Sequence, residues 1–151
     1  MSERERFLTF SIADEEFAIP LLKVREVIAV PTITPVPNSS PDFRGVMNLR
    51  GKVISVVDLR IRFSAKSSRD PAAENAVIVL DLAGSTSLGI LVDAVSQVMA
   101  PSPEKIQPAP NLDSRLPEGC ITAITQAESG LIFILDIDKT IETSRLQRSS
   151  A

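Results

Sequence analysis

The segment with the highest density of polar and glycine residues runs from position 43 to 54 and reads FRGVMNLRGKVI. Arg50 carries a guanidinium whose donors form a rigid fork, and Asn48 carries an amide that both donates and accepts hydrogen bonds. Gly51 follows Arg50, and glycine tolerates the positive φ that a tight hairpin turn requires. The segment therefore predicts two strands joined at Arg50 and Gly51, with side chains suited to polar recognition near the turn.

Side chains suited to catalysis or metal binding are scarce in the rest of the chain. The 151 residues include no His and a single Cys, which excludes a Ser-His-Asp triad, a Cys-His pair and a zinc site. The adjacent acids Asp14, Glu15 and Glu16 are interpreted as a solvated turn rather than as catalytic carboxylates. Gly45 and Gly51 are spaced too widely for a phosphate-binding loop. We therefore expect no enzymatic activity, no metal and no cofactor.

Composition also indicates the cellular compartment in which the protein functions. Cys120 has no second cysteine with which to form an internal disulfide, which favours a reducing compartment. The longest apolar runs, 76–80 and 131–135, fall far short of the ~20 residues needed to span a bilayer. The charged N-terminus is not followed by the apolar core of a signal peptide. We expect a cytoplasmic protein that does not insert into a membrane.

Alternation of apolar and polar residues predicts short strands that would position the polar segment. Leu8, Phe10 and Ile12 alternate with polar residues, and the pattern resumes after a polar turn, which predicts a hairpin. Residues 53–59 and 77–82 are β-branched runs too short for typical helices. The 11 prolines favour strand edges and loops. The pattern therefore indicates small, mainly β barrels rather than a helical bundle.

The two halves of the sequence resemble each other in three segments that occur in the same order. These are FAIPLLKVREV and LGILVDAVSQV at 17–27 and 88–98, ITPVPN and IQPAPN at 33–38 and 106–111, and VDL and LDI at 57–59 and 135–137. Ordered repeats of this kind predict an internal duplication. Asp58 recurs as Asp136, which favours a structural cause common to both halves.

The duplication predicts one subdomain at about 13–63 and a second at about 76–137. Residues 64–75 are small, charged or proline and predict a connecting loop, and 142–151 form a polar tail. Only the first half carries the Asn-Leu-Arg-Gly sequence of the hairpin. A difference between two repeats at matching positions makes that hairpin the first place to look for function.

The sequence GVMNLRG at 45–51, followed by VDLR at 57–60, resembles the signature of the CheW family of chemotaxis coupling proteins. Further agreement comes from FLTF at 7–10, VREV at 24–27 and LDIDK at 135–139. The resemblance covers roughly residues 6–141. It implies a single domain over 1–151 built from two five-stranded SH3-like barrels, with short helical turns and with terminal strands exchanged between the barrels.

The same resemblance implies a non-catalytic scaffold. Members of this family link the cytoplasmic signalling tips of chemoreceptors to the regulatory domain of a histidine autokinase. The receptor tip would dock in the groove between the barrels, and one barrel would pair with the like-folded kinase domain. The expected location is the cytoplasm, with recruitment to receptor arrays at the inner face of the membrane.

Residue by residue, the resemblance assigns two partly overlapping contact sets. The expected receptor-binding residues are Val24, Glu26, Gly45, Asn48, Arg50 and Val77. The expected kinase-binding residues are Leu8, Leu21 and Val24. Glu26 and Arg50 match a charged pair that would form a bidentate guanidinium–carboxylate bond and shape the groove.

Each assignment has a structural alternative in the residues themselves. The aliphatic residues could belong to the core, Gly45 could be a turn glycine, and Asn48 could bind hairpin backbone groups. The sequence departs from the family at 106–112, where family members often carry a basic and an aromatic residue that join signalling units into rings. Here those places hold Gln107 and Leu112, so the ring-forming role is not carried over.

A small β-barrel that binds nucleic acid is the alternative function. Residues 41–70 contain seven basic and three acidic residues, a local excess of positive charge. Readers of single strands also need aromatic residues on which bases stack, and this region has only Phe43 and Phe63. The net charge of the whole chain is −3, which disfavours binding to phosphates.

Overall fold

The computed structural model describes residues 5–12, 15–37, 42–59, 76–82, 86–109, 120–128 and 130–141. These residues form eleven β strands, two short 3-10 helices, η1 (Leu21–Lys23) and η2 (Pro103–Lys105), and a helical turn at 137–141. The strands are β1 (Phe7–Ile12), β2 (Glu15–Pro20), β3 (Val24–Ala29), β4 (Phe43–Leu49), β5 (Lys52–Asp58), β6 (Ala76–Leu82), β7 (Thr86–Val92), β8 (Ala94–Met99), β9 (Gln107–Pro108), β10 (Ile121–Ala127) and β11 (Gly130–Leu135). The predicted mainly β fold with short helical turns is confirmed.

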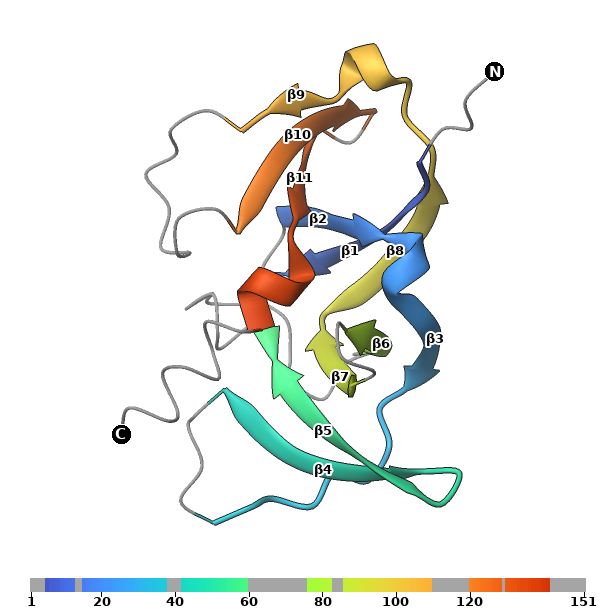
Figure 1. Cartoon of the computed structure of the whole chain (residues 1–151), viewed down its shortest axis with the longest axis vertical. Helices are drawn as coiled ribbons and strands as arrows, with labels where there is room; N and C mark the ends of the chain where they lie inside the picture. Colours follow the sequence, from blue (N-terminus) through green and yellow to red (C-terminus); the bar gives the residue numbers. More distant parts are fainter. Residues whose placement is uncertain are drawn as a thin grey trace.

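The strands form two sheets, with β9 and β10 at one end of the molecule and β4 and β5 at the other (Figure 1). Sheet A has the strand order β8-β1-β2-β11-β10-β9, and sheet B has the order β3-β6-β7-β5-β4. Neighbouring strands are antiparallel except for the pairs β11–β2 and β5–β7, which are parallel. Sheet A thus has one strand more than the five expected, the two-residue β9.

Each sheet takes strands from both halves of the sequence. The β1–β2 hairpin of the first half joins β8–β11, and the β6–β7 hairpin of the second half joins β3–β5. The two sheets therefore do not coincide with the segments 13–63 and 76–137. The hairpins β4–β5 and β10–β11 are equivalent, since the N–H of Asp58 donates to the carbonyl of Asp42 at 2.7 Å and that of Asp136 donates to Cys120 at 2.8 Å. Asp58 and Asp136 thus occupy equivalent backbone positions in the two hairpins.

The main hydrophobic core is shared by the two sheets. Phe10 and Ile19 from sheet A pack in one cluster with Ile78 and Ile90 from sheet B, and all four are fully buried. The alternation seen in the sequence puts these side chains on one face of each strand. Cys120 is buried as well. Shared burial fixes the two sheets against each other, so the edges and hairpins that they carry are held in defined positions.

A buried hydroxyl without a partner lies on β10. The side chain of Thr125 is opposite Ile132, as that of Met47 is opposite Ile54 in the equivalent hairpin. Thr125 is 2% exposed, and its Oγ1 has no hydrogen-bond partner among the described residues. Burial of an unpaired hydroxyl costs free energy that a methyl group of the same shape does not.

Thr125→Val is therefore expected to raise the free energy of unfolding by about 1 kcal/mol, measured by urea denaturation. Thr140→Val is the matched control, because the Thr140 side chain is also buried but donates to the carbonyl of Asp136 at 2.8 Å. Loss of that bond is expected to lower stability. The explanation fails if the two substitutions change stability in the same direction.

Candidate functional site

The turn between β4 and β5 has the conformation predicted for it, with one unusual residue. Arg50 has φ of 52° and Gly51 has φ of 85°, so both central residues of this two-residue turn have positive φ, as in a type I′ turn. The Oδ1 of Asn48 accepts a hydrogen bond from the Gly51 N–H at 2.8 Å. Asn48 therefore stabilises the hairpin itself. Positive φ costs a non-glycine residue about 1–2 kcal/mol, and strain of this kind often marks a functional position.

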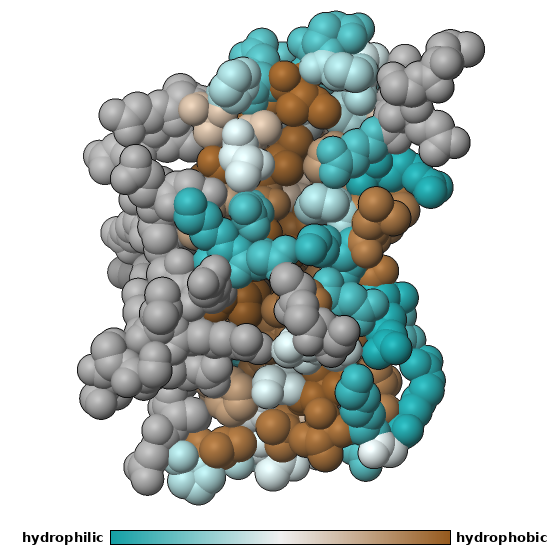
Figure 2. All heavy atoms as spheres, viewed as in Figure 1, coloured by the Kyte–Doolittle hydropathy of each residue, from teal (hydrophilic) through white to brown (hydrophobic). Residues whose placement is uncertain are grey.

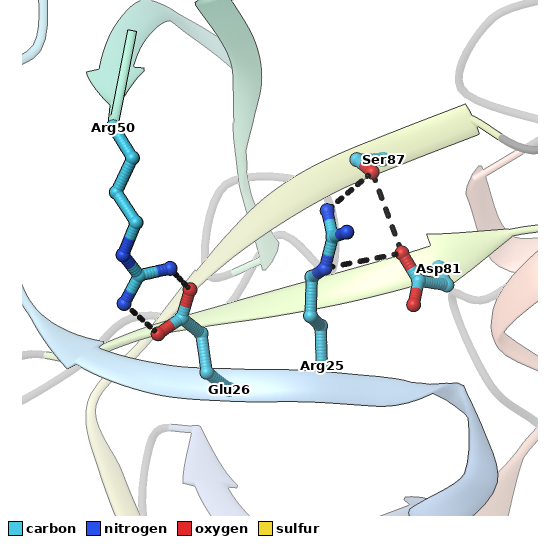
Figure 3. Close-up of polar contacts among 5 residues, drawn as sticks. All are labelled: Arg25, Glu26, Arg50, Asp81 and Ser87. Carbon is cyan, nitrogen blue, oxygen red and sulfur yellow. Dashed lines mark hydrogen bonds and ion pairs between the residues drawn. The ribbon is translucent and has the colours of Figure 1, made fainter. Parts of the chain in front are cut away.

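Arg50 forms a two-bond ion pair with Glu26 on β3, as the resemblance implied. Its Nη1 donates to Oε1 at 2.6 Å and its Nη2 donates to Oε2 at 2.8 Å (Figure 3). The Glu26 side chain is 23% exposed and that of Arg50 is 73% exposed. The hydrogen bond from Arg50 lowers the pKa of Glu26, and the same bond raises the pKa of Arg50. The pair holds the hairpin tip against the edge strand β3.

The lowered pKa of Glu26 predicts how the pair responds to pH. A carboxyl with a lowered pKa in the folded protein contributes stability above its ordinary pKa of 4.5 and loses it as pH falls through the folded value. We expect the NMR resonances of Gly51 to be constant at neutral pH and to shift only at a pH below the ordinary carboxyl pKa of 4.5. The Glu26→Gln variant should lack this shift, and an unchanged titration in that variant would contradict the assignment.

A second polar group lies beside the ion pair on β3. The register between β3 and β6 shifts between Val24 and Glu26, which leaves Arg25 as the extra residue of a bulge. Its Nη1 donates to Ser87 Oγ at 3.4 Å, and Ser87 Oγ donates to Asp81 Oδ1 at 3.4 Å (Figure 3). Sequence reasoning missed this group because its three members lie on three different strands.

Gly45 is required by contacts within the chain. Its φ is 136°, and a Cβ atom at this position would lie 2.0 Å from the carbonyl oxygen of Thr34. Thr34 forms an isolated bridge with Val46, with backbone hydrogen bonds of 2.8 and 2.9 Å. The space beside Gly45 is therefore filled by the backbone of residues 34–35. These contacts within the chain explain the glycine, and no contact with a partner protein is needed to explain it.

The predicted aliphatic contacts divide into buried and accessible residues. Leu8 is 5% exposed and Val77 is fully buried, so the side chains of both belong to the interior and are not available to a partner in this structure. Leu21 and Val24 are half-buried and pack against the main core. Leu22, which sequence reasoning missed, is 94% exposed. Two consecutive leucines in a three-residue connection are the signal that could have identified it, because both cannot point inward.

Edge strands also expose aliphatic side chains that sequence reasoning did not select. Val27 on β3, Val30 just after it and Val98 on β8 are each 42% to 50% exposed. β3 and β8 occupy edges of sheets B and A, so each pairs with one strand only. Figure 2 shows apolar surface on both sides of a hydrophilic band across one face of the molecule. The accessible apolar side chains suit contact with a protein partner.

A metal-binding arrangement is absent from the part of the chain that the structure describes. No group of three or more His, Cys, Asp or Glu in these residues could hold a metal ion, and no helix among them is long and apolar enough to cross a membrane. Of the three adjacent acids, Asp14 lies outside the described residues. Gln107 is exposed on β9, and Leu112 also lies outside the described residues.

Three of the seven basic residues in the region proposed for nucleic acid lie among the described residues. Arg50 is engaged by Glu26, and Arg44 and Lys52 are exposed on separate strands of the hairpin. The remaining four basic residues of this region, Arg60, Arg62, Lys66 and Arg69, lie outside the described residues. The structure gives the nucleic-acid alternative no continuous basic surface among the described residues.

Comparisons with known proteins identify the family. The CheW-like domain model matches residues 6–145. The chain is 33% identical to the chemotaxis protein CheW of Klebsiella aerogenes, over 94% of this chain and 84% of that protein. It is 28% identical to protein FrzA of Myxococcus xanthus, over 97% and 91%. The crystal structure of the scaffolding protein TtCheW from Thermoanaerobacter tengcongensis superposes with a TM-score of 0.82 at 27% identity, over 92% and 93%.

These matches confirm the predicted pair of SH3-like barrels and give the nucleic-acid alternative no support. They also confirm that the chain is not an enzyme, because its relatives are named as chemotaxis and scaffolding proteins. The chain therefore belongs to the CheW family and is a scaffold protein of chemotaxis.

Proposed function

We propose that this scaffold couples the cytoplasmic tips of chemoreceptors to the regulatory domain of a histidine autokinase. The observation that carries the proposal is the Glu26–Arg50 pair, which holds a strained hairpin tip against the edge of sheet B. A bidentate pair fixes the position of the hairpin tip relative to β3, and so fixes the shape of the surface that the two form. Val24 and Val27 lie on the same strand as Glu26, and Val27, which is 42% exposed, supplies an accessible apolar contact beside the half-buried Val24.

The receptor surface of this proposal consists of Val24, Glu26 and Arg50, with Asn48 holding the turn. Gly45 and Val77 would act indirectly, by allowing close packing beneath that surface. The kinase surface consists of Leu21 and Val24, with Leu22 as an additional exposed anchor, while Leu8 supports it from the interior. Apolar anchors within a polar rim are the usual source of affinity at protein interfaces. In this role the protein works at receptor arrays on the inner face of the membrane.

The direct test is a binding titration of the purified protein with a chemoreceptor signalling tip and, separately, with the regulatory domain of a chemotaxis kinase. We expect saturable binding to both partners. Leu22→Asp should weaken binding of the kinase domain and leave that of the receptor tip unchanged. Failure of the unmodified protein to bind either partner would refute the proposed coupling.

A further inference from the structure

A hollow of about 390 Å³ lies on sheet A, between the start of β1, η1, β10 and the turn at 137–141. Its size falls within the range of pockets that hold small ligands. Its apolar lining consists of Phe7, Pro20, Ile106, Ala123, Ile134, Leu135 and Ile137. Phe7 and Ile134 are themselves buried in a core cluster of this sheet, so packing fixes the floor of the hollow in place.

The rim of this hollow is negatively charged. Three carboxylates line it, those of Glu5, Asp136 and Asp138, together with the ammonium of Lys23. The Lys23 Nζ lies 2.7 Å from Asp138 Oδ2, so the cation of the rim is already engaged. Asp136 Oδ1 accepts a hydrogen bond from the backbone N–H of Lys139 at 3.0 Å, which orients this carboxylate.

We propose that the hollow binds an arginine side chain presented by a partner protein. The three methylene groups of arginine would lie on the apolar floor, and its guanidinium would meet the carboxylates of Asp136 and Glu5 at the rim. Arginine suits the site better than lysine because its planar fork can bind a carboxylate through two bonds and is more weakly hydrated than an ammonium. An anionic group would be repelled by the net negative charge of the rim, and a neutral donor would form weaker hydrogen bonds than a guanidinium.

This site adjoins the proposed kinase surface, because Pro20 and Lys23 line the hollow, but Leu21, Leu22 and Val24 do not line it. None of Glu26, Asn48, Arg50 and Leu22 lines the hollow. The arginine site can therefore be tested without a receptor tip or a kinase domain. Its failure would leave the coupling function standing, and failure of coupling would leave the arginine site standing.

The experiment is a chemical-shift titration of the 15N-labelled full chain with N-acetyl-arginine amide. We expect saturable shifts at the amides of Phe7, Thr122 and Leu135. N-acetyl-citrulline amide has the same shape without the charge and should bind at least about tenfold more weakly, because charge-assisted hydrogen bonds are lost. Guanidinium chloride lacks the apolar stem and should give no saturable shift at these positions.

Two variants and one control connect the binding to the rim. Asp136→Asn keeps an oxygen that can accept from Lys139, and Glu5→Gln removes an exposed charge, so both should fold and bind the arginine probe roughly three- to tenfold more weakly. Asp81→Asn removes an equal charge from β6, outside the hollow, and should bind normally. Equal binding of citrulline or of N-acetyl-lysine amide, shifts that do not saturate, or equal loss in all three variants would each overturn the proposal.

Discussion

Gly45→Ala is expected to lower the free energy of unfolding by about 4 kcal/mol, the sum of backbone strain and overpacking of about 1–3 kcal/mol each. The φ of 136° is unfavourable for alanine, and its Cβ would lie 2.0 Å from the Thr34 oxygen and 2.7 Å from the Thr34 carbonyl carbon. Backbone atoms held by the Thr34–Val46 bridge can move aside only at a cost in free energy, because the hydrogen bonds of the bridge would be disturbed. Domains are typically stable by about 5–15 kcal/mol, so much of the molecule's stability would be lost.

Gly130→Ala separates the two causes. Gly130 has φ of 125°, close to that of Gly45, but a Cβ there would meet no atom within 4 Å. It should therefore lose only the part due to backbone strain, about 1–3 kcal/mol. Urea denaturation followed by circular dichroism measures both variants. Equal losses would contradict the steric argument, and a Gly45→Ala protein of normal stability that fails to bind a receptor tip would favour the alternative of direct contact.

Local patterns were sufficient to predict the hairpins and the turn. The apolar alternation in β1 and β2 places Leu8, Phe10, Phe17 and Ile19 in one core cluster, and the turn at Arg50–Gly51 depends on one glycine. The strand with which each hairpin pairs could not be predicted from local patterns. β2 pairs with β11, and β7 pairs with β5, across more than thirty residues of sequence, and no local pattern specifies such parallel contacts. The exchange between sheets therefore depended on the resemblance to a family.

Exposure was the property that the sequence could not provide. Val77 and Val27 are both apolar residues on strands, yet the first is fully buried and the second is 42% exposed. The difference arises because β6 is buried on both faces from Val77 to Leu80, whereas β3 exposes every second residue, including Val27. Likewise the Glu26–Arg50 pair joins residues 24 positions apart, and the two lie near opposite ends of the strand order of sheet B, so the curling of the sheet into a barrel brings them together. A contact surface is thus determined by topology even where each strand is predictable.

Arg50→Glu is expected to weaken binding of a chemoreceptor tip by roughly 10- to 100-fold, about 1.4 kcal/mol for each tenfold step. The substitution replaces a two-bond attraction by two like charges at the hairpin tip, so the tip should leave the edge of β3. Because the Arg50 side chain is 73% exposed, the free energy of unfolding should change little. Binding of the kinase regulatory domain should be unaffected.

Two further variants show whether the pair itself is responsible. Arg44→Glu makes the same change of charge on an exposed residue of the same hairpin and should leave receptor binding within about twofold, because a solvated charge contributes little. The exchange Glu26→Arg with Arg50→Glu restores the attraction in reverse and should recover much of the lost affinity. If Arg50→Glu and Arg44→Glu weaken binding equally, net charge rather than the pair governs the contact. If the exchanged pair binds no better than Arg50→Glu alone, the receptor recognises the guanidinium of Arg50 directly and not the shape of the surface formed by the hairpin tip and β3.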